Sequence, residues 1–145
     1  MLGRARRDQS GAAFLEMAIA LPFLLLAAIG VAEFGRVYFN GIKVTNAAMA
    51  GAEYGGQNIG SYDAVRVRQV ARDDAGDQTL QVTSNTVCRC PGSDAVVPCS
   101  DTCVGYGSPQ FFIEVTAAKT HTFVFRYPGL PESITVTRTS TFREQ

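Results

Sequence analysis

The sequence contains little of the chemistry that catalysis requires. It has one histidine, His121, which lies in an alternating, threonine-rich segment and is therefore predicted to be structural. It has no glycine loop that would bind phosphate, no serine-nucleophile motif and no second histidine for a metal site. Two carboxylates, Glu114 and Glu132, are not spaced as a catalytic pair. We therefore expect a protein that is not an enzyme and that has no cofactor and no small-molecule substrate.

The chain also lacks net charge, internal repeats and low-complexity tracts. Because 13 basic and 13 acidic residues balance, charge gives no reason to expect a nucleic-acid partner. The basic residues are nevertheless unevenly placed, since Arg4, Arg6 and Arg7 are accompanied only by Asp8 at the start of the chain. A length of 145 residues, 46% of them apolar, predicts one modest domain and an additional segment.

The additional segment is an apolar run that follows the arginines. Residues 12–32 contain one charged side chain, Glu16, and one proline, Pro22. A helix needs ~20 predominantly apolar residues to span a bilayer, so this run is long enough. Basic residues that flank such a helix stay in the cytoplasm. We therefore predict a cytoplasmic leader of residues 1–11, a transmembrane segment of residues 12–32, and a domain of residues 33–145 beyond the membrane.

A secretory signal peptide is the alternative interpretation of this run, with Gly30-Val31-Ala32 as its cleavage site. Two features count against it. The run is longer than the ~7–15 apolar residues of an ordinary signal. Glu16 is also unfavourable there, because an acidic residue at the centre of a membrane helix costs on the order of 2.5–3.5 kcal/mol.

The residues around Glu16 carry a resemblance to a known family. Gly11 is followed by Ala-Ala-Phe-Leu and then Glu16, which resembles the cleavage site of type IV pilins and pseudopilins. The wider pattern is GAAxxExAIALPFLLL, followed by Glu33-Phe34-Gly35-Arg36. It is similar to the TadE-like family, which contains minor pilins or pseudopilins of tight-adherence (Flp pilus) systems. The resemblance covers residues 9–55, and residues 127–144 are weakly similar to the end of that family.

This resemblance implies a maturation step and a set of partners. A prepilin peptidase would cut after Gly11, so that the mature chain would start at Ala12. Implied partners are that peptidase, the major pilin, other pseudopilins, the pilus assembly platform and the membrane. The protein would be a single-pass protein of the bacterial inner membrane, with its N-terminus cytoplasmic and its C-terminal domain periplasmic. It would stay there or be incorporated into an extracellular pilus.

Two residues of the apolar run have predicted structural roles. Glu16 can pair with the new α-amino group of Ala12, or with a neighbouring subunit, and so set the register of packing. The alternative is that Glu16 only reaches the cytoplasmic headgroups. Pro22 lacks a backbone donor and clashes with the carbonyl of Ala18, which predicts a kink. Prolines are also tolerated in membrane helices without such a role.

Helical periodicity continues beyond the membrane segment. One helix is predicted from about residue 12 to residue 54, with Gly55-Gly56 as its end and small residues such as Ala47, Ala48 and Gly51 permitting close packing. Its apolar positions are Phe34, Val37, Tyr38, Ile42, Thr45, Met49 and Ala52. A second helix is predicted from the N-cap Ser61 to residues 73–76. Its apolar stripe is Val65, Val70 and Ala71, and its water-facing arginines are Arg66, Arg68 and Arg72.

From residue 78 onward the apolar residues alternate with polar ones, which predicts strands with one buried face. The alternating positions are Leu80 and Val82; Phe111, Ile113 and Val115; Phe123, Phe125 and Tyr127; and Ile134, Val136 and Phe142. Residues 111–127 form either one strand or a hairpin around residues 117–119, and residues 128–131 connect to the last strand. The predicted fold is α+β, with a long N-terminal helix, a short helix and a three- or four-stranded antiparallel sheet.

Four cysteines, Cys88, Cys90, Cys99 and Cys103, lie within one short window. Their spacing is not that of the usual zinc knuckles. If the window lies outside the cytoplasm, two disulfides are expected. We predict the nested pairing, Cys88–Cys103 with Cys90–Cys99. A stapled loop of residues 88–103 also supports a second function from a different class, a membrane-anchored or secreted periplasmic binding domain that uses this loop for recognition.

Overall fold

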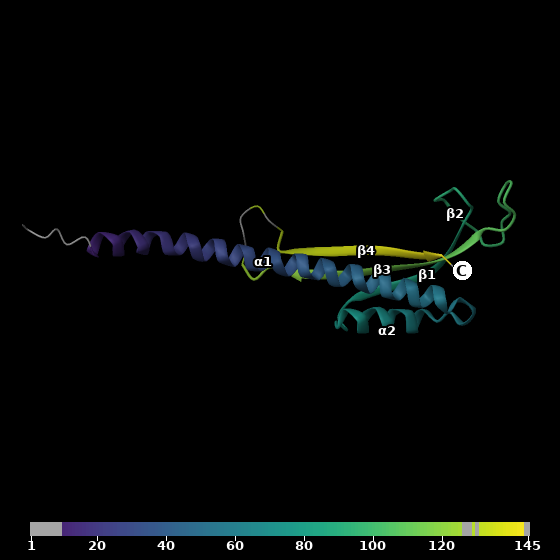
Figure 1. Ribbon diagram of the computed structural model, residues 1–145, viewed down its shortest axis with the longest axis horizontal. Helices are drawn as coiled ribbons and strands as arrows, with labels where there is room; N and C mark the ends of the chain where they lie inside the picture. Colours follow the sequence, from purple (N-terminus) through teal and green to yellow (C-terminus); the bar gives the residue numbers. More distant parts are fainter. Residues whose placement is uncertain (1–9, 126–128, 130, 144–145) are drawn as a thin grey trace, which may run out of the picture. The chain divides into compact units, whose positions relative to one another are not determined.

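The computed structural model describes residues 10–125, 129 and 131–143. The arginines of residues 4–7 and the predicted positions Tyr127 and Pro128 lie outside the described residues. The chain divides into two compact units, Met1–Arg36 and Val37–Gln145. Figure 1 shows the elements, which in chain order are helix α1 (Ser10–Gln57), a 3-10 turn (Ile59–Ser61), helix α2 (Ala64–Ala75) and strands β1 (Gln81–Arg89), β2 (Val96–Val97), β3 (Gln110–Thr122) and β4 (Ser133–Arg143).

Helix α1 contains 48 residues, and the predicted long N-terminal helix is confirmed. The predicted end at Gly55-Gly56 is wrong, because the helix continues to Gln57. Both glycines are buried. A Cβ added to Gly55 would lie 2.8 Å from Cγ2 of Ile113, and one added to Gly56 would clash with the ring of Phe142. These glycines therefore allow the helix to approach the sheet closely instead of ending the helix.

Helix α1 contributes the side that carries its small residues to the core of the Val37–Gln145 unit. The α1 side chains that it buries are small ones, namely Val44, Ala47, Ala48 and Ala52. The larger side chains of the predicted apolar stripe are instead exposed, namely Phe34, Tyr38, Ile42 and Met49. That part of the prediction is wrong, because the close approach to the sheet leaves room only for small side chains. The predicted packing role of Ala47, Ala48 and Gly51 is confirmed.

Helix α2 begins two residues later than predicted. Asp63, not Ser61, is its N-cap, and Asp63 Oδ1 accepts a 2.8 Å hydrogen bond from the backbone N–H of Val65. The predicted end is confirmed, since Gly76 is a left-handed C-cap with φ 59°. The buried stripe consists of Val67, Ala71 and Ala75, whereas Val65 is exposed. Val67, Ala71 and Ala75 follow one another at intervals of four residues and so share one side of the helix, whereas Val65 lies on another side.

The four strands form one antiparallel sheet in the order β2-β1-β3-β4, and the α+β fold class is confirmed. Strand β3 is a single strand of 13 residues, so the alternative of a hairpin around residues 117–119 is wrong. Phe123 and Phe125 follow this strand and do not extend it. The buried side of β3 consists of Ile113, Val115 and Ala117.

Within the Val37–Gln145 unit, α1 lies against α2 and against the sheet. A Cβ added to Gly51 would lie 3.1 Å both from Ala71 of α2 and from Val115 of β3. On β4, the predicted alternation is confirmed, with partly buried Ile134, Val136 and Phe142 on one side and exposed Thr135, Thr137, Thr139 and Thr141 on the other. The threonine side is thus the exposed face of the sheet, where hydroxyl groups of β3 and β4 pair across the strands at 2.8 and 2.9 Å.

An ion pair joins the segment after α2 to β3. Lys119 Nζ lies 2.7 Å from Asp77 Oδ2. The backbone N–H and the hydroxyl of Thr79 donate to Asp77 Oδ1 at 2.9 and 2.6 Å. The hydrogen bond from Lys119, and after it that from Thr79, lowers the pKa of Asp77 from 3.8 to about 2. Because the folded-state pKa is the lower one, the pair stabilises the fold above about pH 4 and loses its contribution as the pH falls toward 2.

We expect Asp77→Asn to lower the free energy of unfolding near pH 7 by roughly 1–2 kcal/mol and to have a much smaller effect near pH 2. The reason is that asparagine cannot form the ionised pair, and at pH 2 the wild-type pair is already weakened. Urea unfolding of the full chain in nonionic detergent, followed by tyrosine fluorescence, measures both values. Asp74→Asn, at an exposed carboxylate of α2, is the control and should change neither. An equal loss at both pH values would contradict the assignment.

Candidate functional site

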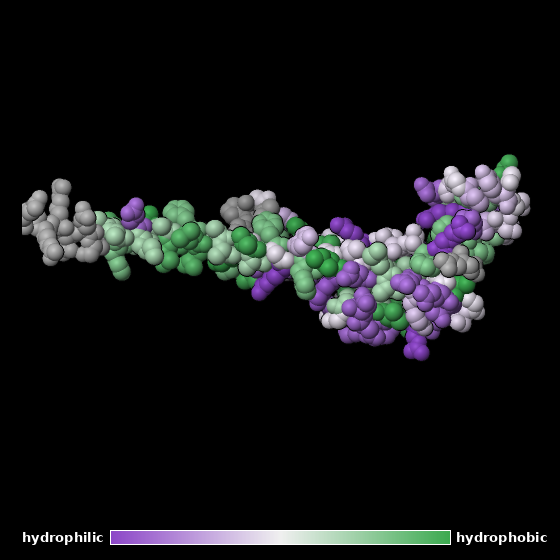
Figure 2. Space-filling view, in the orientation of Figure 1, coloured by the Kyte–Doolittle hydropathy of each residue, from purple (hydrophilic) through white to green (hydrophobic). Residues whose placement is uncertain are grey.

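The Met1–Arg36 unit exposes apolar side chains on all sides of its helix. Every residue from 11 to 28 is exposed, including Phe14 at 80% and Phe23 at 71%. Figure 2 shows this part of α1 as a mostly hydrophobic surface. A helix that is apolar all round is normally buried in protein or in lipid. By length and composition α1 could span a membrane as a single-pass anchor, although a signal sequence passes the same test.

Gly11, Ala12 and Glu16 lie in the first two turns of α1. All three are exposed, and a Cβ added to Gly11 would meet nothing within 4 Å. Glu16 follows Ala12 by four residues, so the two occupy the same side of the helix one turn apart. A protease or a second helix could therefore approach this end of the helix, and an amino group on Ala12 would lie about one turn from the carboxylate.

Pro22 lies inside α1, in the middle of the exposed apolar stretch. The helix does not end there, although proline removes one backbone donor. Membrane helices accommodate such a proline when neighbouring groups satisfy the freed carbonyl. A kink at Pro22 stays a prediction.

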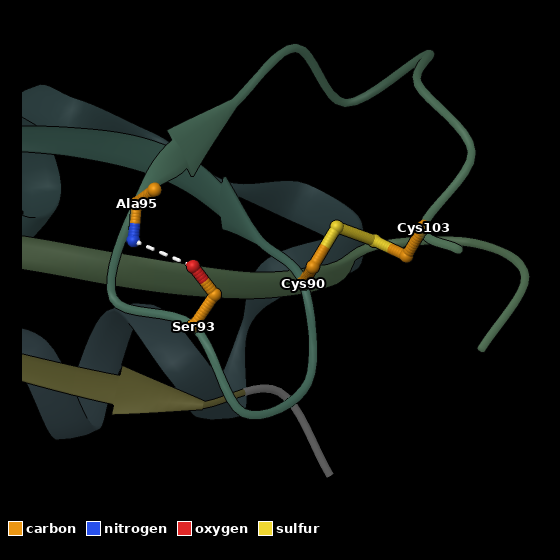
Figure 3. The surroundings of a disulfide bond; sticks show 4 residues. All are labelled: Cys90, Ser93, Ala95 and Cys103. Carbon is orange, nitrogen blue, oxygen red and sulfur yellow. Dashed lines mark hydrogen bonds between the residues drawn. A yellow bond between two sulfur atoms is a disulfide. The ribbon is translucent and has the colours of Figure 1, made fainter. Parts of the chain in front are cut away.

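The four cysteines form two disulfides, and Figure 3 shows the second of them. Cys88 is bonded to Cys99 with their Cα atoms 5.2 Å apart, and Cys90 is bonded to Cys103 with Cα atoms 5.5 Å apart. The expectation of two disulfides is confirmed, and the nested pairing is wrong. Cys88 and Cys103 are buried, so the bridges belong to the structured base of the loop.

The pairing follows from two successive reversals of the chain. A turn after Cys90, closed by a hydrogen bond from Ser93 N–H to Cys90 O, sends the chain back along β1. Strand β2 then pairs Val97 with Cys88, which brings the following Cys99 beside Cys88. A second turn is closed by a hydrogen bond from Asp101 N–H to Pro98 O. It reverses the chain again and brings Cys103 back beside Cys90. The nested pairing assumed a single reversal.

An ion pair holds the base of this loop against the sheet, and the tip of the loop is exposed. Arg89 Nη2 lies 3.0 Å from Glu114 Oε2 of β3, and its guanidinium lies over the ring of Phe112 at 5.6 Å. Beyond the disulfides, a bridge between Cys103 and Gly107 forms a tight tip. Val104 and Tyr106 in this tip are exposed at 96% and 67%. The loop is therefore a rigid support that presents two apolar side chains.

The other polar candidates are structural. His121 contacts the ring of Phe123 edge-on, with centroids 5.4 Å apart. Of the predicted water-facing arginines, Arg66 is exposed, whereas Arg72 is partly buried and donates from Nε to the carbonyl of Leu80 at 3.0 Å. Within the part of the chain that the structure describes, no cluster of His, Cys, Asp or Glu could hold a metal ion.

The sequence predicts the N-terminal motif, the four cysteines and the packing of Gly51, but it predicts Gly55 as part of the helix end and not as a packing position. Gly51 and Gly55 are four residues apart and are interleaved with Ala47, Ala48 and Ala52. Such a row of small residues on one side of a helix is the signal that indicates close packing.

Comparison with known proteins agrees with the N-terminal motif. Residues 11–53 match the family model described as TadE-like protein, which confirms the predicted resemblance over that stretch. No curated protein and no solved structure matches the chain. The match covers 43 of the 145 residues, and all of them lie within α1.

Proposed function

We propose that the chain, whose residues 11–53 match the TadE-like family, is a minor pilin or pseudopilin that takes part in assembly of a tight-adherence type IV pilus. The observation that carries this proposal is the exposed start of α1. There Gly11, Ala12 and Glu16 stand at the end of a helix that is apolar and uncovered from residue 11 to residue 28. A soluble protein would have to bury this surface, whereas a membrane or a bundle of like helices covers it.

Processing comes first in the proposed mechanism. A prepilin peptidase cuts after Gly11 and removes the leader of residues 1–11. The new α-amino group on Ala12 is positively charged at neutral pH, because such groups have pKa values of about 7.7–8.0. Glu16, one turn away, pairs with this amine or with that of a neighbouring subunit. Such a pair neutralises a carboxylate whose unpaired charge would raise the free energy of the helix in the membrane. It also fixes the register in which the apolar helices pack.

The remaining topology is proposed to follow from the leader and the disulfides. The leader stays in the cytoplasm, residues 12–32 span the inner membrane, and residues 33–145 form a periplasmic domain. The two disulfides support this placement, because such bonds form and persist in oxidising compartments. The implied partners are the peptidase, the major pilin, other pseudopilins and the assembly platform.

The experiment that tests the proposal is the intact mass and N-terminal sequence of the chain purified from the membranes of its own cells. We expect a chain that starts at Ala12. Gly11→Leu should give the full-length mass, because the bond after residue 11 would no longer be cut. Gly30→Leu is the matched control, since a Cβ at either glycine meets nothing within 4 Å. This control should be processed normally.

A different N-terminal residue would indicate a different class of protein. A chain that starts near Glu33, and that Gly30→Leu blocks, would be a secreted binding domain released by a signal peptidase. A chain that keeps Met1 would be an uncleaved membrane anchor. Either result would contradict the pilin proposal and direct attention to the disulfide loop as the recognition site.

A further inference from the structure

Strand β4 is a long edge of the sheet that is paired on one side only. In the order β2-β1-β3-β4 it pairs with β3 along all 11 of its residues. Within residues 10–125 and 131–143 no other strand adjoins it. On the opposite edge, β2 is only two residues long and pairs only with Cys88 and Arg89, so the rest of β1 is also unpaired on that side. Unpaired backbone donors and acceptors on a long edge are complementary to another extended chain.

An apolar groove runs beside this edge on the helix side of the sheet. Its volume is about 500 Å³, within the size range of pockets that bind small ligands, and it lies between α1 and β4. Tyr38 and Ile42 of α1 line one wall, and Val136 and Arg138 of β4 line the other. Tyr38 and Ile42 are exposed at 75% and 43%. Two large apolar side chains that a core would normally cover are therefore left open next to an open strand edge.

The edge and the groove together define the chemistry of their occupant. A strand added beyond β4 would lie about 4.7–4.9 Å from it and would continue the pleat of the sheet. Every second side chain of that strand would then point to the helix side and enter the groove. In such strand addition, backbone hydrogen bonds provide affinity and pockets for alternate side chains provide specificity. We propose that β4 and the groove bind an extended segment of another protein, which adds a fifth strand to the sheet.

Arg138 sets the charge of the segment that fits. It is the sixth of the 11 residues of β4 and lies on the helix side, between Val136 and Ser140. Its guanidinium is exposed and donates to the carbonyl of Thr137 at 3.0 Å. The ion pairs of the described residues do not include it. A carboxylate opposite Arg138 would therefore complete the site, flanked by apolar side chains at alternate positions.

The same arginine argues against a second copy of this chain as the occupant. Two β4 strands paired antiparallel about their centres would place Arg138 opposite Arg138. Like charges directly opposite each other destabilise a strand pair, and inward-facing charges are a common protection of edge strands. Pairing of two β4 edges is therefore disfavoured, whereas pairing of β4 with an acidic strand of another protein is favoured.

A pair of synthetic peptides tests this proposal on the full chain in nonionic detergent. One has the sequence Val-Thr-Val-Thr-Glu-Thr-Val-Thr-Val, and the other has lysine in place of the central glutamate. We expect the glutamate peptide to bind at least tenfold more tightly in a fluorescence anisotropy titration. We also expect it to slow hydrogen exchange of the β4 amides but not of the β1 amides. Arg138→Glu, at an exposed side chain, should reverse the preference between the two peptides.

Two variants and one measurement make the result decisive. Ile42→Asp should weaken both peptides, because it places a charge in the groove, and Met49→Asp, at an exposed α1 residue outside the groove, should weaken neither. Equal binding of both peptides, or unchanged exchange of the β4 amides, would overturn the proposal. So would sedimentation of the free chain as a dimer with protected β4 amides, because the occupant would then be a second copy.

Discussion

Replacing Gly55 with valine is expected to lower the free energy of unfolding by about 2–4 kcal/mol, one of the largest effects of any single change in the chain. A Cβ at this position would lie 2.8 Å from Cγ2 of Ile113 and 3.3 Å from Cγ2 of Val67. Both neighbours are completely buried, so neither can move aside cheaply. Valine would force α1 away from β3 and α2 together. Urea unfolding of the full chain in nonionic detergent, followed by tyrosine fluorescence, gives the value.

Gly35→Val is the matched control, because it makes the same change in the same helix where a Cβ would meet nothing within 4 Å. It should alter the free energy of unfolding by less than about 0.5 kcal/mol. Similar losses at both positions would mean that valine weakens the helix itself. The close approach of α1 to the sheet would then not be the cause.

Removal of the Cys88–Cys99 bridge is expected to have an effect of similar size. The double variant Cys88→Ala/Cys99→Ala should lose about 2–4 kcal/mol of unfolding free energy, because the unfolded chain regains the freedom that the bridge removes. The buried Cys88 side chain would also leave a small cavity in the sheet. The same urea titration measures the loss, and limited proteolysis should show cleavage appearing within residues 91–102.

The pairing itself has a separate control. Cys90→Ala/Cys103→Ala should retain the Cys88–Cys99 bond, whereas Cys88→Ala/Cys103→Ala should leave Cys90 and Cys99 as two free thiols. Thiol alkylation and mass spectrometry count them. A bonded Cys90–Cys99 pair in the second variant would restore the nested pairing and contradict the observed one.

The sequence predicted most of the elements because their signals are local. The apolar run of residues 12–32 and the helical periodicity after it are enough to define α1, and the alternation of Ile134 with Val136 is enough to define β4. Of the predicted apolar positions of α1, Ala52 is buried in the core, whereas the large ones, such as Phe34 and Met49, are exposed. Large residues such as Tyr38 and Ile42 dominate the periodicity. The helix lies so close to the sheet, however, that side chains of that size do not fit between them.

The candidate sites divide in the same way. Gly11, Ala12 and Glu16 could be proposed as a site from the sequence, because that proposal depends only on their spacing along one helix. The disulfide pairing could not, because it depends on a second turn at residues 98–101. The open edge of β4 and its groove depend on strand order, which places Val136 beside α1 although about 100 residues separate them in the chain.

Under the proposed orientation, the two disulfides can form before the core is complete. They close stretches of only 11 and 13 residues, whereas the core joins Gly55 of α1 to Ile113 of β3 across a much longer loop. Short loops close fast, and long-range pairing is slow. Under the proposed orientation the chain emerges into the periplasm from α1 onward, so the cysteines arrive before β4. An oxidase can therefore finish its work on a nascent chain whose sheet is still incomplete, and export delayed at that point would leave a chain that is oxidised but not yet packed.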